Sequence, residues 1–252
     1  MTKLNLLLLF VFLTNFVSYA QTLSGRVLEA DTKSPIPYVN IGILGKNNGT
    51  VSDSLGYFSI TYKDANKNDT LKFSCIGFKS IILKPADLIG KSHNEISMKK
   101  LIYTLQEVVV KPLSKRDIKV MGKTGSSKFM AIGTKCTQPG SEIGVQFKNK
   151  GPLRIQKVNL YCSMDCKDEV LFRINISDGK VDRPDNSLLK KPIIFKYRFK
   201  KGDNFFDLSE YNVEVSKDFF LSYELISLPK GSRGPQFGAS LFGTKSLFRY
   251  TS

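Results

Sequence analysis

The side chains best suited to chemistry in this 252-residue sequence are four cysteines, Cys75, Cys136, Cys162 and Cys166. A thiol can form a disulfide, bind zinc or act as a nucleophile. Cys75 stands alone in the apolar stretch Leu71–Ile76, which predicts a buried free thiol. Cys162 and Cys166 flank a Ser-Met-Asp segment, so we expect a disulfide between Cys136 and one of them, or between the two. Sequence alone cannot choose the pairing.

The single histidine, His93, limits the other chemistry that the chain can carry. A structural zinc site usually needs four Cys or His ligands, and Ser-His or Cys-His catalysis needs a histidine beside the nucleophile. His93 lies in a short polar loop, Lys91–Asn94, where a solvated histidine is expected. The sequence therefore predicts no catalytic residue, no metal ligand and no cofactor.

Carboxylates offer two weaker alternatives. Asp178, Asp182 and Asp185 cluster in the expected loop Ser177–Asn186, where loop carboxylates could bind Ca²⁺. Two basic residues interleave with them, so a solvated loop is the favoured interpretation. A glycosidase-type pair of carboxylates elsewhere in the second half stays open as an alternative, because such pairs are defined by their separation in space.

The first 20 residues have the layout of a secretory signal peptide. Lys3 supplies a positive charge, the apolar run Leu4–Val17 follows, and Ser18-Tyr19-Ala20 places small residues at the cleavage positions. The run is short for a membrane span of about 20 residues. We therefore expect export to the periplasm, the outer membrane or the extracellular space, with no transmembrane span in the mature chain.

Residues 21–111 have the pattern of a small β-sandwich, because short apolar runs alternate with Gly-, Asn- and Asp-rich turns. The strands expected here are Thr22–Glu29, Tyr38–Leu44, Thr50–Ser52, Gly56–Tyr62, Thr70–Cys75, Phe78–Leu83, Ile96–Met98 and Leu105–Val110. The residues 112–127 that follow are basic and contain Pro and Gly, which predicts a linker.

Four motifs in this region resemble carboxypeptidase-regulatory-like domains, and they occur in the family's order. They are Ser24–Val27, Pro35–Ile41, Gly49–Ile60 and Phe73–Phe78. The resemblance implies a seven-stranded, transthyretin-like β-sandwich. It also implies an accessory module that lacks the zinc ligands of the peptidases for which the family is named. The glycines, Asp53, Phe58 and Ile60 of the third motif are expected to build the turn and the core.

Residues 128–252 are also rich in strands, which makes the predicted fold all-β. The strands expected are Glu142–Lys148, Leu153–Tyr161, Glu169–Ile176, Ile193–Phe199, Phe219–Ile226 and Phe237–Phe242. In the third of these, alternation places Phe172, Ile174 and Ile176 toward a core, and Leu171, Arg173 and Asn175 toward water. This half loosely resembles carbohydrate-binding-like jelly rolls in the order of its motifs, which are Arg173–Ile176, Pro184, Leu188-Leu189, Phe206–Leu208 and Phe220–Glu224. We therefore expect a second, jelly-roll-like β-sandwich.

The formal net charge of +16 is concentrated in the second half. Residues 112–252 carry 25 Lys and Arg against 14 Asp and Glu, which favours anionic partners through a salt-screened field. In the basic segment Lys196–Lys201 the aromatic residues should face inward, so no nucleic-acid partner is expected. The sequence thus predicts an exported, non-catalytic binding protein for a glycan or a cell-envelope polymer. The alternatives are an assembly or structural partner of an envelope protein and, less favoured, a glycan hydrolase.

Overall fold

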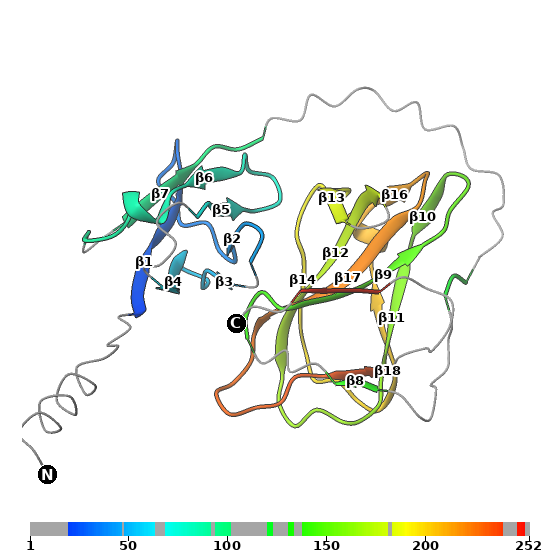
Figure 1. Cartoon of the computed structure of the whole chain (residues 1–252). Coiled ribbons are helices and arrows are strands. Elements are labelled where there is room, and N and C mark those ends of the chain that lie inside the picture. The colour runs from blue at the N-terminus through cyan, green and yellow to red at the C-terminus, as the bar shows by residue number, and fades with distance from the viewer. Residues whose placement is uncertain are drawn as a thin grey trace, which may run out of the picture.

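The computed structural model describes two β-domains that pack against each other (Figure 1). The described residues are 20–46, 48–63, 69–91, 94–101, 120–122, 131–133, 138–180, 183–238 and 246–249. The predicted signal peptide lies outside them except for Ala20, as do the strand Leu105–Val110, His93 and Cys136. Within the described residues, no helix is long and apolar enough to cross a membrane.

The N-terminal domain is a sandwich of two sheets. Its strands are β1 (Ala20–Glu29), β2 (Asn40–Ile43), β3 (Gly49–Val51), β4 (Tyr57–Lys63), β5 (Leu71–Ser74), β6 (Ile81–Leu83) and β7 (Asn94–Met98), with the short helix η2 (Pro85–Asp87) before the last. One sheet has the order β4-β1-β7, in which β1 and β7 are parallel, and the other has the order β3-β2-β5-β6. The two sheets enclose one apolar core, in which Phe58 and Phe73 meet edge to face at 5.3 Å.

The turn before β4 confirms the architectural role expected for its residues. The Asp53 carboxylate accepts hydrogen bonds from the backbone N–H groups of Leu55 and Tyr57 at 2.8 and 2.9 Å. Gly56 has a φ of +80°, and a Cβ there would lie 2.6 Å from the carbonyl oxygen of Val27. Only glycine can therefore bring this turn so close to β1.

The C-terminal domain is a larger antiparallel sandwich. Its strands are β8 (Ala131–Gly133), β9 (Glu142–Phe147), β10 (Leu153–Ile155), β11 (Lys157–Cys162), β12 (Val170–Lys180), β13 (Arg183–Ser187), β14 (Ile193–Tyr197), β15 (Gly202–Asp207), β16 (Val213–Val215), β17 (Phe219–Ser227), β18 (Gln236–Gly238) and β19 (Ser246–Arg249), with the short helix η3 (Ser209–Tyr211) before β16. One sheet has the order β15-β11-β18-β8. The six-stranded sheet has the order β13-β12-β17-β9-β19, with β14 also paired to β12.

An aromatic cluster fills the space between these two sheets. Phe172 lies at its centre, with ring centroids 4.9 to 5.8 Å from four other rings, namely Phe195, Phe199, Phe206 and Tyr223. Ile174 and Ile176 are buried beside it. The predicted inward face of this strand is thus confirmed, and so is the inward side chain of Phe199 between the exposed Arg198 and Lys200.

Several sequence-based expectations are corrected. The segment Ser177–Asn186 was expected to be a loop, but β12 and β13 extend through most of it as a hairpin. The expected strand Leu153–Tyr161 is two strands, because β10 pairs with β16 whereas β11 pairs with β15 and β18. Strands β8, β13, β15, β16 and β19 were not predicted, since they are short or polar residues interrupt their apolar pattern.

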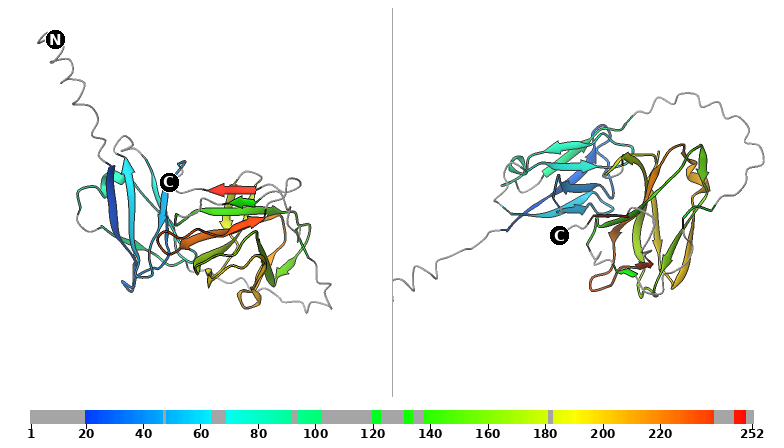
Figure 2. Two further views of the ribbon diagram at one scale, coloured as in Figure 1. Left: turned by 90° about the horizontal axis from the view of Figure 1, so that it is seen from below. Right: turned by 45° about the vertical axis from the view of Figure 1, so that its right-hand side comes forward.

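The outward face of β12 was expected to be wet, and at Arg173 this is wrong. The side chain of Arg173 is only 2% exposed, because the N-terminal domain covers this part of the six-stranded sheet. The two domains lie side by side in both views of Figure 2. The contact places the turn before β2 over β12 and β17.

Candidate functional site

A buried polar cluster lies on the outer face of the six-stranded sheet. Arg173 of β12 stands opposite Glu224 of β17, and Glu224 stands opposite Glu142 of β9. Arg173 Nε is 3.2 Å from Glu224 Oε2, and Arg173 Nη2 donates a hydrogen bond to Glu224 Oε1 at 3.4 Å. The Asn175 amide donates to both carboxylates, at 2.7 Å to Glu224 and 2.9 Å to Glu142, and the Ser222 hydroxyl donates to Glu142.

Arg173 also connects the two domains. Its Nη1 donates to the backbone carbonyl of Tyr38 at 3.2 Å, and its Nη2 donates to Asn40 Oδ1 at 2.8 Å. Glu224, the anion that faces this guanidinium, is fully buried. A charge pair without access to water requires such partners, because burial of an uncompensated charge is costly. The cluster therefore contributes two hydrogen bonds across the boundary between the domains.

A pocket of about 610 Å³ lies beside this cluster, between the two domains. That volume falls within the range of small-molecule sites, which often occur at domain interfaces. The wall from the N-terminal domain consists of Tyr38, Thr50, Val51, Ser52, Asp53, Ser54, Tyr57, Phe58 and Ser59. The wall from the C-terminal domain consists of Pro139, Leu171, Ile226 and Ser227.

The walls of this interdomain pocket carry aromatic rings and hydroxyl groups. The ring of Tyr57 is 44% exposed, and the Arg26 guanidinium lies 4.7 Å from its centroid. Arg26 is itself fixed by a 2.9 Å hydrogen bond to the carbonyl of Leu55. Among the described residues that line the pocket, Asp53 is the only one with a charged side chain. The lining thus combines apolar, aromatic and hydroxyl-bearing side chains with one carboxylate.

The backbone is unusual on both walls of the pocket. Tyr38 has a φ of +56°, which is costly for a residue with a Cβ. On the other wall, the pairing of β12 with β17 shifts register between Leu171 and Phe172, which leaves Ile226 as an extra residue. Non-glycine residues at positive φ and β-bulges both concentrate at functional sites.

Comparison with known proteins gives the family of the N-terminal domain. Residues 23–110 match the family model of the CarboxypepD_reg-like domain. The N-terminal domain is a CarboxypepD_reg-like domain. Domains of this family are non-catalytic, in agreement with the resemblance of its four motifs. A search of curated proteins finds no match to the chain.

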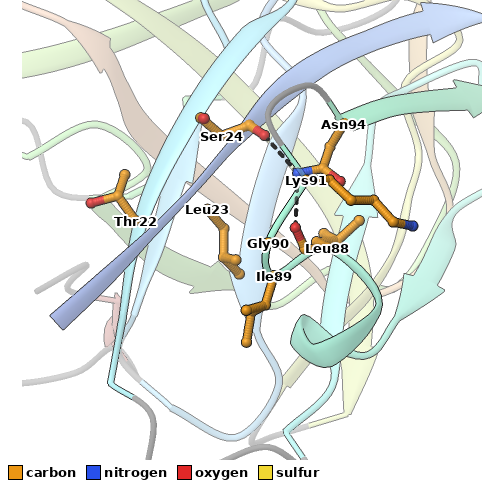
Figure 3. Close-up of a pocket in the computed structure, with 8 residues that line it drawn as sticks. All are labelled: Thr22, Leu23, Ser24, Leu88, Ile89, Gly90, Lys91 and Asn94. Atoms are coloured by element: carbon orange, nitrogen blue, oxygen red, sulfur yellow. Dashed lines mark hydrogen bonds between the residues drawn. The ribbon is translucent and has the colours of Figure 1, made fainter. Parts of the chain in front are cut away.

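A second, smaller pocket of about 310 Å³ lies within the CarboxypepD_reg-like domain (Figure 3). Asn94 closes one side of it by donating to the carbonyls of Ser24 and Leu88, at 2.9 and 3.1 Å. These bonds join β1 to the chain after η2, so Asn94 has a structural role. No side chain from the other domain reaches this pocket among the described residues that line it.

The cysteines do not assemble into a reactive centre in the described part of the chain. Cys162 and Cys166 are buried free thiols in the C-terminal core. Burial, with a smaller contribution from the neighbouring Cys166, raises the pKa of Cys162 to about 12. The expected alternative of a Cys162–Cys166 disulfide is not formed, and because Cys136 lies outside the described residues, its pairing stays a prediction. Cys75 is free as expected but only half-buried, where the CarboxypepD_reg-like domain meets the other domain.

The predicted carboxylate loop does not converge on a metal either. Asp178 accepts a hydrogen bond from the backbone N–H of Asn186 at 2.8 Å, which closes the hairpin. Asp182 and the side chain of Asp185 lie outside the described residues. No group of three or more His, Cys, Asp or Glu residues could hold a metal ion within the described ranges.

Sequence reasoning missed both the buried cluster and the interdomain pocket. Glu142 and Glu224 are 82 positions apart, and only the register of β9 with β17 makes them neighbours. No periodicity marks such a pair. The positive φ of Tyr38 likewise lies where a strand was expected, because the motif Pro35–Ile41 ends in β2 but begins in a turn.

Proposed function

We propose that this chain is an exported binding protein whose ligand, a neutral glycan, occupies the interdomain pocket. The observation that carries the proposal is the chemistry of the pocket walls. Tyr38 and Tyr57 offer aromatic faces, and Thr50, Ser54 and Ser227 offer hydroxyls, with one carboxylate among them. Tyrosine combines an apolar ring with a polar tip, which suits the apolar faces and hydroxyl edges of a sugar.

The pocket favours a neutral ligand over an acidic polymer. The basic residues that give the chain its charge of +16 do not line it. An anionic polysaccharide would place its charge beside Asp53 with no lining cation to balance it. Export is supported by the pattern of the first 20 residues, and a location in the cell envelope or outside the cell follows from it.

The carboxylate pair that the structure brings together, Glu142 and Glu224, does not support the hydrolase interpretation. Glu224 is fully buried and Glu142 nearly so, beneath the CarboxypepD_reg-like domain. The Asn175 amide and the Ser222 hydroxyl donate hydrogen bonds to carboxylate oxygens of this pair. A glycosidase needs both groups beside the scissile bond, which this arrangement does not allow.

Affinity electrophoresis of the full chain tests the proposal, with gels that contain dextran as a neutral glucan or alginate as an acidic polysaccharide. Dextran should retard the wild type more strongly than alginate does. Tyr57→Ala should lose at least about tenfold in affinity for dextran, because its exposed ring forms part of the wall.

Tyr161→Ala is the matched control, since this half-buried tyrosine lies on β11, in the four-stranded sheet that does not line the pocket. It should bind dextran as the wild type does. Absence of retardation by dextran, or equal retardation of Tyr57→Ala and the wild type, would overturn the assignment of the pocket.

A second candidate function, docking of an envelope protein, is favoured by a different surface. Lys196, Arg198 and Lys200 form an exposed basic row along and beyond β14, which pairs only with β12 among the described strands. Such a row attracts an acidic protein surface. Charge reversal of all three residues should abolish co-purification of a partner protein from envelope fractions while dextran binding is retained.

A further inference from the structure

The hydrogen bonds of Arg173 fix the distance between the two walls of the interdomain pocket. One bond reaches the carbonyl of Tyr38, which lines the wall from the CarboxypepD_reg-like domain. Leu171, two residues before Arg173 on the same face of β12, lines the opposite wall. We propose that Arg173 is a positioning residue that couples docking of the two domains to ligand binding, an inference that rests on the proposed function.

The chemistry of the guanidinium suits this role. Its planar fork lets Nη1 and Nη2 donate to two acceptors of the other domain, while the edge formed by Nε and Nη2 also faces Glu224. With 2% exposure, the side chain has no alternative water partners in the docked state. Separation of the domains would remove both acceptors at once, so this contact is present or absent as a unit.

Coupling follows because the pocket exists only where the two domains meet. A ligand that touches both walls binds the docked state and so stabilises it. A substitution that lowers the populated fraction of the docked state therefore lowers the apparent affinity for the ligand in proportion to that fraction. A substitution at Arg173, which does not itself line the pocket, should therefore reduce affinity.

Cys75 provides a built-in probe of docking that needs no ligand. It is a half-buried free thiol at the end of β5, close enough to Arg173 and Glu224 to feel their charges. Its neighbour Ile76 packs against the core of the C-terminal domain. Burial raises the pKa of Cys75, which together with poor access keeps its thiol unreactive while the domains are docked.

Labelling with iodoacetamide, read by mass spectrometry of the peptide that contains Cys75, tests the positioning role in the full chain. Arg173→Met should raise the labelling rate of Cys75 at least about tenfold. Arg198→Met, at an exposed arginine of the same domain, should leave it unchanged. Cys162, buried in the C-terminal core, should stay unlabelled in every variant, which shows that this domain remains folded.

Two further variants separate docking from folding. Asn40→Ala removes one acceptor from the other side of the interface and leaves the buried ion pair intact, so it should raise the Cys75 rate by a smaller factor. Arg173→Met combined with Glu224→Leu removes both buried charges, so the domain folds but cannot make the cross-domain bonds. Labelling of Cys75 at the wild-type rate in that double variant would overturn the positioning role.

Dextran tests the coupling. It should slow the labelling of Cys75 in the wild type, and it should retard Arg173→Met less than the wild type in the gel. Arg173→Lys, which retains the charge but not the fork, should recover part of the retardation. Equal retardation of the wild type and Arg173→Met would overturn the coupling and leave the proposed function standing. If dextran retards neither, the proposed function and the coupling both fail, while the Cys75 rates still decide whether Arg173 holds the domains together.

Discussion

Strand β12 buries side chains on both of its faces, and the two faces differ in the interactions that hold them. On the inner face, Phe172 and its neighbours pack into an aromatic core. On the outer face, Arg173 and Asn175 meet two carboxylates and the backbone of the other domain. Both faces exclude water, but the first does so by packing apolar groups and the second by pairing polar ones.

The difference indicates which face of β12 determines how the second domain is oriented. Hydrophobic burial is non-directional and tolerates rearrangement, whereas a buried ion pair is stable only when each partner is present in the right geometry. The inner face can therefore hold one domain together, while the outer face selects one orientation of the second domain. Substitutions should reveal the difference between the faces. On each face, the loss in free energy of unfolding when one partner is removed can be compared with the loss when both are removed.

Phe172→Ala on the inner face should have one of the two largest effects. It removes a fully buried ring that contacts four others, which should lower the free energy of unfolding by about 3 to 5 kcal/mol. Hydrogen exchange of the β12 and β17 amides measures this loss. Phe205→Ala, at an exposed ring of the same domain, is the control and should change exchange little. Similar losses at the two positions would contradict the assignment of the core.

Glu224→Leu on the outer face should cost about 3 to 5 kcal/mol when made alone, because it leaves the buried Arg173 without its carboxylate. Adding Arg173→Met should then recover much of that loss, as measured by the same amide exchange. On the inner face a second truncation, Ile174→Ala added to Phe172→Ala, should deepen the loss instead. If adding Arg173→Met to Glu224→Leu lowered the free energy of unfolding further instead of recovering part of it, the comparison between the two faces would be wrong.

The inner face was predictable from sequence and the outer face was not. Alternation alone places Phe172, Ile174 and Ile176 in the core, and all three are buried. The same alternation placed Arg173 in water, since a charged residue opposite an apolar one usually marks the wet side of a sheet. What covers the sheet depends on a second domain more than 100 residues away along the chain.

The N-terminal sandwich was easier to predict than the pocket for a related reason. Its turns use residues whose backbone or side-chain chemistry is local, such as Gly56 and Asp53. The pocket depends on the register of β12 with β17 and on where Tyr38 meets Leu171, which no local pattern encodes.

Asn175→Ala should have an intermediate effect, because the amide serves both Glu142 and Glu224. Removing a donor from buried carboxylates costs about 1 to 3 kcal/mol, and amide exchange in β9 and β17 measures it. Asn159→Ala is the matched control, since that amide also bonds a carboxylate, Asp203, but at an exposed site. Equal effects would mean that burial does not distinguish the outer face.

The smallest effect should come from an exposed ion pair, and it should depend on pH. The Lys148 ammonium, with the Asn149 backbone N–H, lowers the pKa of Asp218 below its ordinary value. A carboxyl group whose pKa is lower in the folded than in the unfolded chain, where it is about 3.9, stabilises the fold fully above that pH. The contribution is lost as the pH falls through the folded-state value.

The melting temperature of Asp218→Asn should therefore lie slightly below that of the wild type at about pH 6, and the two should converge by about pH 2. Added salt should also shrink the gap at about pH 6, because exposed pairs are screened. Asp31→Asn, at an exposed carboxylate of the other domain, is the control for the change of charge. A difference in melting temperature that persists at low pH would mean that the charge of Asp218 is not the cause of its stabilising effect. Asp218 would then act through its hydrogen bond from the Asn149 backbone N–H, which an Asn side chain would accept less well. In that case the exposed pair would resemble the outer face of β12, where the geometry of the hydrogen bonds determines how much they stabilise the fold.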